Sequence, residues 1–192
     1  MPSTTRRRFV LGLAGLIPLP FIARRFHGRA VRDLDPGLLR AVGKVVLPSE
    51  LGAAGVERAV AGFEHWIAGY REGEELLHDY GSGEIRRTGP SPALRWANQL
   101  RDLDASARKQ GKPFTALDPG RQEALIRSAL AGSQPSGLPA IDRAPHVAVG
   151  LLAWFYGTPE SVDLCYGVRI GRNGCRPLAQ SGQPPVTLAG RS

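Results

Sequence analysis

Apolar residues return at helical spacing in the body of the chain. In segment 93–110 they fall at positions i, i+4, i+7 and i+11, and in segment 54–70 they also share one helical face. A third segment, 146–156, is apolar on all sides and predicts a central, buried helix. The residues on the two one-sided faces are Val56, Val60, Phe63 and Ile67, and Trp96, Leu100, Leu103 and Ala107.

Four positions carry a capping residue followed by proline, a pair that typically starts a helix. The cap accepts a hydrogen bond from a free backbone N–H group, and proline presets the helical φ angle. No stretch alternates between apolar and polar residues, so no sheet is predicted. The sequence therefore predicts an all-α, single domain of about five to seven helices. The four starts are Asp35-Pro36, Ser91-Pro92, Asp118-Pro119 and Thr158-Pro159.

Two long, glycine-rich segments, 71–91 and 131–144, interrupt these helices and are predicted to be loops. Loops of about 20 residues are uncommon in a compact domain and often bind something. A surface loop without a ligand is the alternative for each. The tail, 177–192, is rich in Pro, Gly and Ser and is predicted to be extended, with the capacity to lie across a partner.

The N-terminal region, 1–32, has the layout of an export signal. Three arginines precede an uncharged run of 15 residues, Phe9–Ala23. As a helix this run reaches about 22 Å, short of the 30 Å hydrocarbon core, so we do not expect a stable membrane-spanning helix. An uncleaved anchor is an open alternative, because Arg24 and Arg25 could lie at the membrane interface.

The start of this region, T-R-R-R-F-V, resembles a twin-arginine signal, with Arg6, Arg7 and Phe9 in the motif positions. The alternatives are an ordinary secretory signal and a basic tail that matches by chance. The twin-arginine translocase exports proteins that are already folded, chiefly when a cofactor must be inserted before transport. The domain organisation expected is a signal region at 1–32, a helical domain at 33–176 and the tail at 177–192.

Composition and charge narrow the function classes. The chain has 192 residues, 42% apolar and 22% charged, which is typical of a globular protein. Its net charge of +8 comes from the front, where residues 1–32 hold seven arginines and no acid. The remainder has 18 basic against 17 acidic groups and is nearly neutral, so we expect no nucleic-acid partner.

No cofactor, metal or catalytic motif is evident in the body. The two cysteines, Cys165 and Cys175, are separated by nine residues and lack the C-x-x-C-H pattern of c-type haem attachment. Four scattered histidines do not make a metal site, and His65 is expected to be a partly buried structural residue. We therefore predict no catalytic, cofactor-binding or metal-binding residue in this chain.

The two cysteines have a different expected role. In an exported protein they face an oxidising compartment, so a disulfide between Cys165 and Cys175 is predicted, with two free thiols as the alternative. The closed loop is short, and the bridge would stabilise the fold by about 2–3 kcal/mol in the chain-entropy model.

Three segments together resemble the small subunit of membrane-bound, FAD-dependent sugar dehydrogenases, the gluconate 2-dehydrogenase subunit 3 family. They are TTRRRFVLG, LLRAVGKVVLPSELGAAGVERAVAGFEHWIAGY and LLAWFYGTPESVDLCYG, and they span most of the chain. The resemblance implies a periplasmic complex at the inner-membrane surface. A flavoprotein large subunit carries FAD, a multihaem cytochrome c carries haem, and the non-catalytic small subunit supplies the export signal. Association with the membrane would come through the complex or an uncleaved signal.

Aromatic residues and arginine are favoured in the centres of interfaces, which suggests how such a subunit would dock on the flavoprotein. The candidates, together with segment 71–91, are Trp66, Tyr70, Trp154 and Tyr156. The alternative for each of these side chains is burial in the core of the domain. Two other functions are kept open: a stand-alone exported helical binding protein, and an exported enzyme whose site is not recognisable from sequence.

Overall fold

Capping side chains start three of the four predicted proline helices in the computed structural model. The Asp35 carboxylate accepts hydrogen bonds from the N–H groups of Gly37 and Leu38. Asp118 and Thr158 each accept one from the residue three positions later. The structure describes residues 34–79, 82–133, 137–169, 179, 182–184 and 186–188.

The fourth helix starts differently from the prediction. It begins at Ala93, and Pro92 is the N-cap, with φ −74° and ψ −7°. Ser91 still contributes, because its Oγ accepts a hydrogen bond from the Ala93 N–H at 3.4 Å. Ser91 therefore accepts this hydrogen bond from the position before the N-cap, and not from the N-cap itself.

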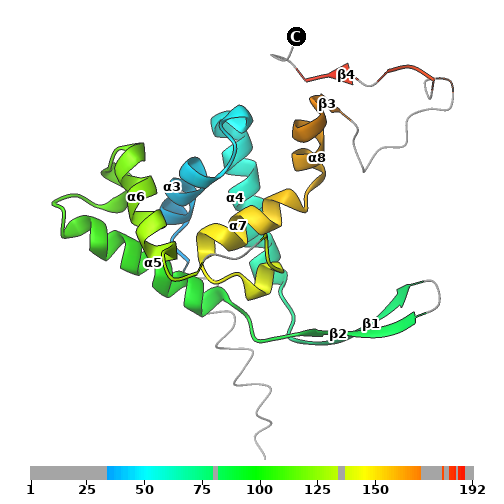
Figure 1. The fold of residues 1–192 in the computed structure, drawn as a ribbon, viewed down its shortest axis with the longest axis horizontal. Coiled ribbons are helices and arrows are strands. Elements are labelled where there is room, and N and C mark those ends of the chain that lie inside the picture. The colour runs from blue at the N-terminus through cyan, green and yellow to red at the C-terminus, as the bar shows by residue number, and fades with distance from the viewer. Residues whose placement is uncertain are drawn as a thin grey trace, which may run out of the picture.

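The fold is all-α, with six α-helices in the part of the chain that the structure describes (Figure 1). The predicted fold class and helix number are confirmed. Short 3₁₀ turns lie at Ser49–Leu51 (η1), Phe114–Ala116 (η2) and Ile141–Arg143 (η3). The helices are α3 (Pro36–Val46), α4 (Gly52–Gly69), α5 (Ala93–Arg108), α6 (Pro119–Leu130), α7 (Val147–Tyr156) and α8 (Pro159–Tyr166).

Helix α7 is central, as its uniformly apolar sequence predicts. It packs against α3, α4, α5 and α8, and six of its ten residues are buried. Both predicted one-sided faces, on α4 and α5, are entirely buried as well. The largest fully buried side chains are Trp96, Phe63, Phe114 and Phe155.

Segment 71–91 is not the loop that the sequence predicts. Strand β1 (Gly73–Asp79) pairs antiparallel with β2 (Ser82–Thr88), in a register that runs from Gly73 opposite Thr88 to Asp79 opposite Ser82. The ribbon projects from the helical body beyond the end of α4 (Figure 1). The two strands contact each other far more than they contact the helices, so their sequences need not show the alternation of a strand that packs on a core.

A second, shorter pairing involves the tail. Strand β3 (Val168–Arg169), directly after α8, pairs antiparallel with β4 (Val186–Thr187), and the Leu188 N–H donates to the Gly167 carbonyl at 2.9 Å. The C-cap Gly167 has φ 68°, a left-handed conformation that glycine adopts without strain. The predicted signal residues Arg6, Arg7 and Phe9 lie outside the described residues, as does Cys175.

None of the helices within the described ranges is long and apolar enough to cross a bilayer. The uncharged run Phe9–Ala23 is outside those ranges.

Candidate functional site

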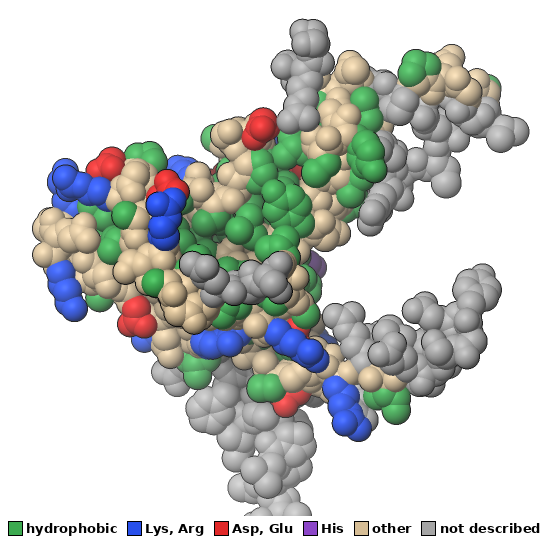
Figure 2. All heavy atoms as spheres, viewed as in Figure 1, with side chains coloured by type: hydrophobic (Ala, Val, Ile, Leu, Met, Phe, Trp, Pro, Cys, Tyr) green, Lys and Arg blue, Asp and Glu red, His purple; other side chains and the backbone are tan. Residues whose placement is uncertain are grey.

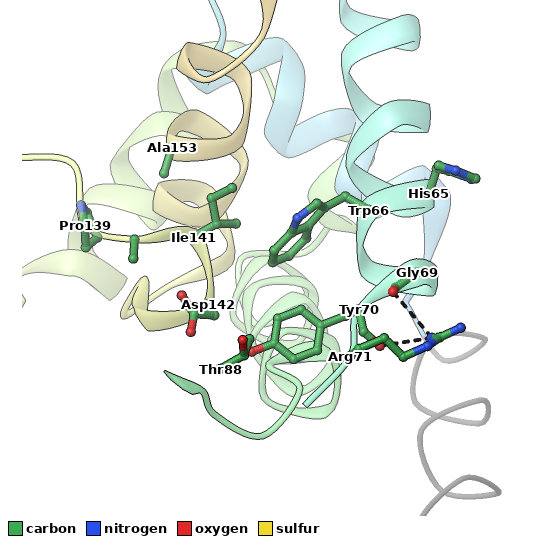
Figure 3. Close-up of a pocket in the computed structure, with 11 residues that line it drawn as sticks. His65, Trp66, Gly69, Tyr70, Arg71, Thr88, Pro139, Ile141, Asp142 and Ala153 are labelled. Carbon is green, nitrogen blue, oxygen red and sulfur yellow. Dashed lines mark hydrogen bonds between the residues drawn. The ribbon is translucent and has the colours of Figure 1, made fainter. Parts of the chain in front are cut away.

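A groove of about 590 Å³ lies where the end of α4, the base of the β1–β2 ribbon and the η3 segment meet (Figure 3). It brings together two of the four aromatic residues that the sequence nominates for partner binding, Trp66 and Tyr70. Both point into the groove from the α4 side, and Ile141 faces them from the η3 side. The lining is His65, Trp66, Gly69, Tyr70, Arg71, Thr88, Pro139, Ala140, Ile141, Asp142 and Ala153.

Trp66 belongs to an aromatic cluster that extends into the core. Its ring centroid lies 6.1 Å from that of Phe63 and 6.3 Å from that of Trp96, and both of these side chains are fully buried. The Tyr70 ring meets Trp66 edge-on, with centroids 5.4 Å apart. Ring pairs at these separations attract one another beyond simple burial, so the aromatic wall of the groove is held from behind by the core.

Tyr70 also closes the base of the ribbon. Its hydroxyl donates a hydrogen bond to the carbonyl of Gly89 at 2.9 Å. Tyr70 lies three residues before β1 and Gly89 directly after β2, so this bond joins the two chain segments where they leave the helical body. One side chain therefore lines the groove and fixes the position of the ribbon beside it.

The opposite wall is attached to α5 by two polar side chains. Arg95 donates from Nη2 to the carbonyl of Ala144 at 2.8 Å and to that of Asp142 at 3.3 Å. Gln99 donates from Nε2 to the Pro145 carbonyl at 2.8 Å and accepts from the Val147 N–H at 2.9 Å. These bonds satisfy backbone groups around the start of α7 and hold the η3 segment against the helix.

The rim of the groove carries one guanidinium and one carboxylate. Arg71 is exposed, and its Nη1 donates to the carbonyls of Gly69 at 3.4 Å and Tyr70 at 3.2 Å. Within the described part of the chain no carboxylate forms an ion pair with Arg71. Asp142 lines the η3 side. An aromatic and apolar wall with a sparse charged rim has the composition of a protein recognition site.

The other two nominated aromatics lie on α7, outside the lining of the groove. The half-buried Trp154 ring covers Gly62 of α4 and meets Phe63 edge-on at 6.2 Å. Tyr156 is 47% exposed and contacts the ring of Phe155 at 5.5 Å. Figure 2 shows hydrophobic side chains gathered over the middle of this face of the molecule. The structure thus places Trp66 and Tyr70 together and does not bring Trp154 and Tyr156 into the same groove.

The histidines occupy places that the sequence does not predict. His65 is exposed at the edge of the groove, so its expected partial burial is wrong. His146 is buried and is the N-cap of α7, where its Nδ1 accepts a hydrogen bond from the Ala148 N–H at 3.2 Å. Burial lowers the pKa of His146 from the ordinary value of 6.5. Its side chain lines a separate cavity of about 310 Å³ together with Gln99 and Asp102.

The wall residues Arg95 and Gln99 were missed at the level of the sequence. Their spacing of four residues places them on one side of α5, a signal that could have marked them as partners of a neighbouring segment. Arg71 falls inside segment 71–91, but nothing in the sequence distinguishes it from the neighbouring charged residues.

Neither a metal centre nor the complete predicted cysteine pair lies within the described residues. Across the described ranges there is no group of three or more His, Cys, Asp or Glu side chains that could hold a metal ion. Cys165 is a free, exposed thiol on α8. Because Cys175 is outside the described residues, the disulfide stays a prediction.

Comparisons of the chain with protein-family models, with curated proteins and with solved structures found no match.

Proposed function

We propose that this chain is the non-catalytic small subunit of a periplasmic, FAD-dependent sugar or sugar-acid dehydrogenase. It would supply the twin-arginine export signal and stabilise the flavoprotein large subunit, which carries the FAD. A multihaem cytochrome c would be the further partner that passes electrons to the inner membrane. This proposal extends the sequence resemblance to the gluconate 2-dehydrogenase subunit 3 family.

The observation that carries the proposal is the groove beside the β1–β2 ribbon. Trp66 and Tyr70 present aromatic surface there, although a small helical domain has a core in which large rings are normally buried. Trp and Tyr are enriched among the residues that dominate binding energy in protein interfaces. The aromatic wall is held by the buried rings behind it, so little side-chain freedom would be lost on binding.

Export in the folded state explains why such a subunit would carry the signal for a partner. A flavoprotein must take up FAD before it is transported, and the small subunit would bind it in the cytoplasm. The signal on one chain would then direct both through the twin-arginine translocase. The complex would function on the periplasmic side, at the inner-membrane surface.

A pull-down of the tagged full chain from its native membrane fraction tests the proposal. We expect a flavoprotein with FAD absorbance to be recovered with the chain, and haem absorbance where the cytochrome is retained. The double variant Arg6→Lys with Arg7→Lys should leave both proteins in the cytoplasm. The matched control, Arg24→Lys with Arg25→Lys, changes a second arginine pair outside the motif and should be exported normally. Recovery of a lone, colourless protein would refute the proposal.

A stand-alone exported binding protein is the second candidate, and the size of the groove favours it. A cavity of about 590 Å³ is within the range of small-ligand sites, roughly 300–1,000 Å³. This candidate predicts a monomer that purifies without a flavoprotein and whose tryptophan fluorescence changes when a small ligand binds beside Trp66.

A further inference from the structure

The β1–β2 ribbon has two outer edges that pair with no other strand of the described chain. Each strand contacts the other extensively and contacts the helices far less. Figure 1 shows the ribbon extending away from the helical body. Along both outer edges, no neighbouring strand within the described residues supplies backbone hydrogen bonds, so each edge has the geometry to pair with another chain.

An isolated ribbon of this kind needs additional support. A two-stranded hairpin is marginally stable at best in water, and a third strand or a helix packed on it is normally required. The bond from Tyr70 to Gly89 fixes only the base of the ribbon. A partner that adds a strand would stabilise the rest and would supply backbone hydrogen bonds along one edge.

The edge of β2 is continuous with the groove. Thr88, the last residue of β2, lines the groove beside Tyr70 and Arg71. In the middle of the same strand, Ile85 is 54% exposed, a large aliphatic side chain that no helix covers. A chain that paired along β2 would cover Ile85 and would then run directly into the aromatic groove.

We propose that the outer edge of β2 accepts an extended strand of the flavoprotein large subunit, which completes a three-stranded sheet. This inference rests on the proposed function and specifies how the two subunits bind. The incoming segment carries an apolar side chain over Ile85 and an acidic side chain near Arg71, whose guanidinium forms no ion pair with a described carboxylate. Backbone hydrogen bonds supply affinity, and the groove supplies specificity.

Residue-resolved hydrogen exchange on the free chain and on the purified complex tests this mode of binding. Successive N–H groups of a strand point to opposite edges, so only every second amide of β2 faces outward. We expect those alternate amides to gain strong protection in the complex. If the complex forms and the β2 amides exchange as they do in the free chain, strand addition is refuted while the proposed function stands. If no flavoprotein binds, both are refuted.

A pair of substitutions tests the contact at Ile85. Ile85→Glu should reduce recovery of the flavoprotein by about tenfold or more, because an apolar contact is replaced by a buried charge. Leu94→Glu is the matched control, since Leu94 is 55% exposed on α5, outside the ribbon. Equal recovery with both variants would overturn the proposed contact, and exchange data on the free Ile85→Glu chain would show whether the ribbon still forms.

Discussion

Gly150 of α7 lies directly against the indole of Trp96 of α5. A Cβ atom at Gly150 would be 2.7 Å from Cζ2 and 3.0 Å from Cη2 of the tryptophan, which is fully buried and has no room to move. Gly150→Ala should therefore destabilise the domain by about 1–3 kcal/mol, although alanine normally favours a helix. The midpoint of chemical denaturation measures this loss.

Gly62 offers a graded comparison. A Cβ there would lie 2.5 Å from Cη2 of Trp154, but that ring is only half-buried and can turn outward. Gly62→Ala should cost less than Gly150→Ala. Gly69 has no atom within 4 Å of a built Cβ and should tolerate alanine without loss. A larger loss at Gly62 than at Gly150 would contradict the idea that burial of the facing ring sets the cost.

Removing the Tyr70 hydroxyl should loosen the ribbon without unfolding the domain. Tyr70→Phe keeps the ring against Trp66 and deletes the hydrogen bond to the Gly89 carbonyl. We expect amide exchange in β1 and β2 to become faster, with a global stability loss of only about 0.5–1 kcal/mol. Tyr166→Phe is the control, because Tyr166 lies at the end of α8 and is 71% exposed. Unchanged exchange in the ribbon would show that the hydroxyl does not hold its base.

Stability should fall in mild acid because of His146. Burial lowers its pKa in the folded state, whereas the unfolded chain takes up a proton near the ordinary value of 6.5. Above that pH both states are neutral at this residue and its contribution is constant. As the pH decreases below it, the unfolded state binds more protons, so the free energy of unfolding decreases until the folded pKa is reached.

Asparagine at position 146 separates this effect from other titrations. His146→Asn retains an N-cap acceptor for α7 and removes the titrating ring. Denaturation curves at about pH 7.5 and about pH 5.5 should then differ less than they do for the wild-type chain. Asp102, which lines the same cavity, is present in both proteins. An unaltered pH dependence in His146→Asn would refute the assignment.

If the chain is exported as proposed, the thiols of Cys165 and Cys175 should be joined in a disulfide. Cys165 is exposed on α8 and therefore accessible to oxidation. We expect thiol-alkylating reagents to label the exported chain only after reduction. Cys165→Ser should lower stability by about 2–3 kcal/mol under oxidising conditions and by much less under reducing ones. Labelling before reduction would establish free thiols instead.

The helical core was predictable because apolar residues at helical spacing mark the face of a helix that is buried. Val60 and Phe63 on α4, and Trp96 and Leu100 on α5, are all buried on the faces that their periodicity defines. The caps Asp35, Asp118 and Thr158 were predictable for a similar reason, since capping depends on residues adjacent in sequence.

The ribbon and the full groove depend on contacts that no local pattern encodes. The strands of the β1–β2 ribbon contact each other far more than they contact the helices, so their sequences need not alternate, and they read as a loop. Residue type alone marks Trp66 and Tyr70 as interface candidates, and it does not separate them from Trp154 and Tyr156. Contacts between residues far apart in the sequence decide which of the four rings line the groove. The contact of Trp154 with Gly62 is one of them.

The attachment of the η3 segment to α5 also affects how the groove can evolve. Arg95 and Gln99 hold the backbone from Asp142 to Val147 directly, so the position of this wall does not depend on the length of chain that leads from α6. Insertions or deletions ahead of Pro139 should therefore be accommodated without moving this wall of the groove. Descendants of this chain could vary in length there while they keep the same groove.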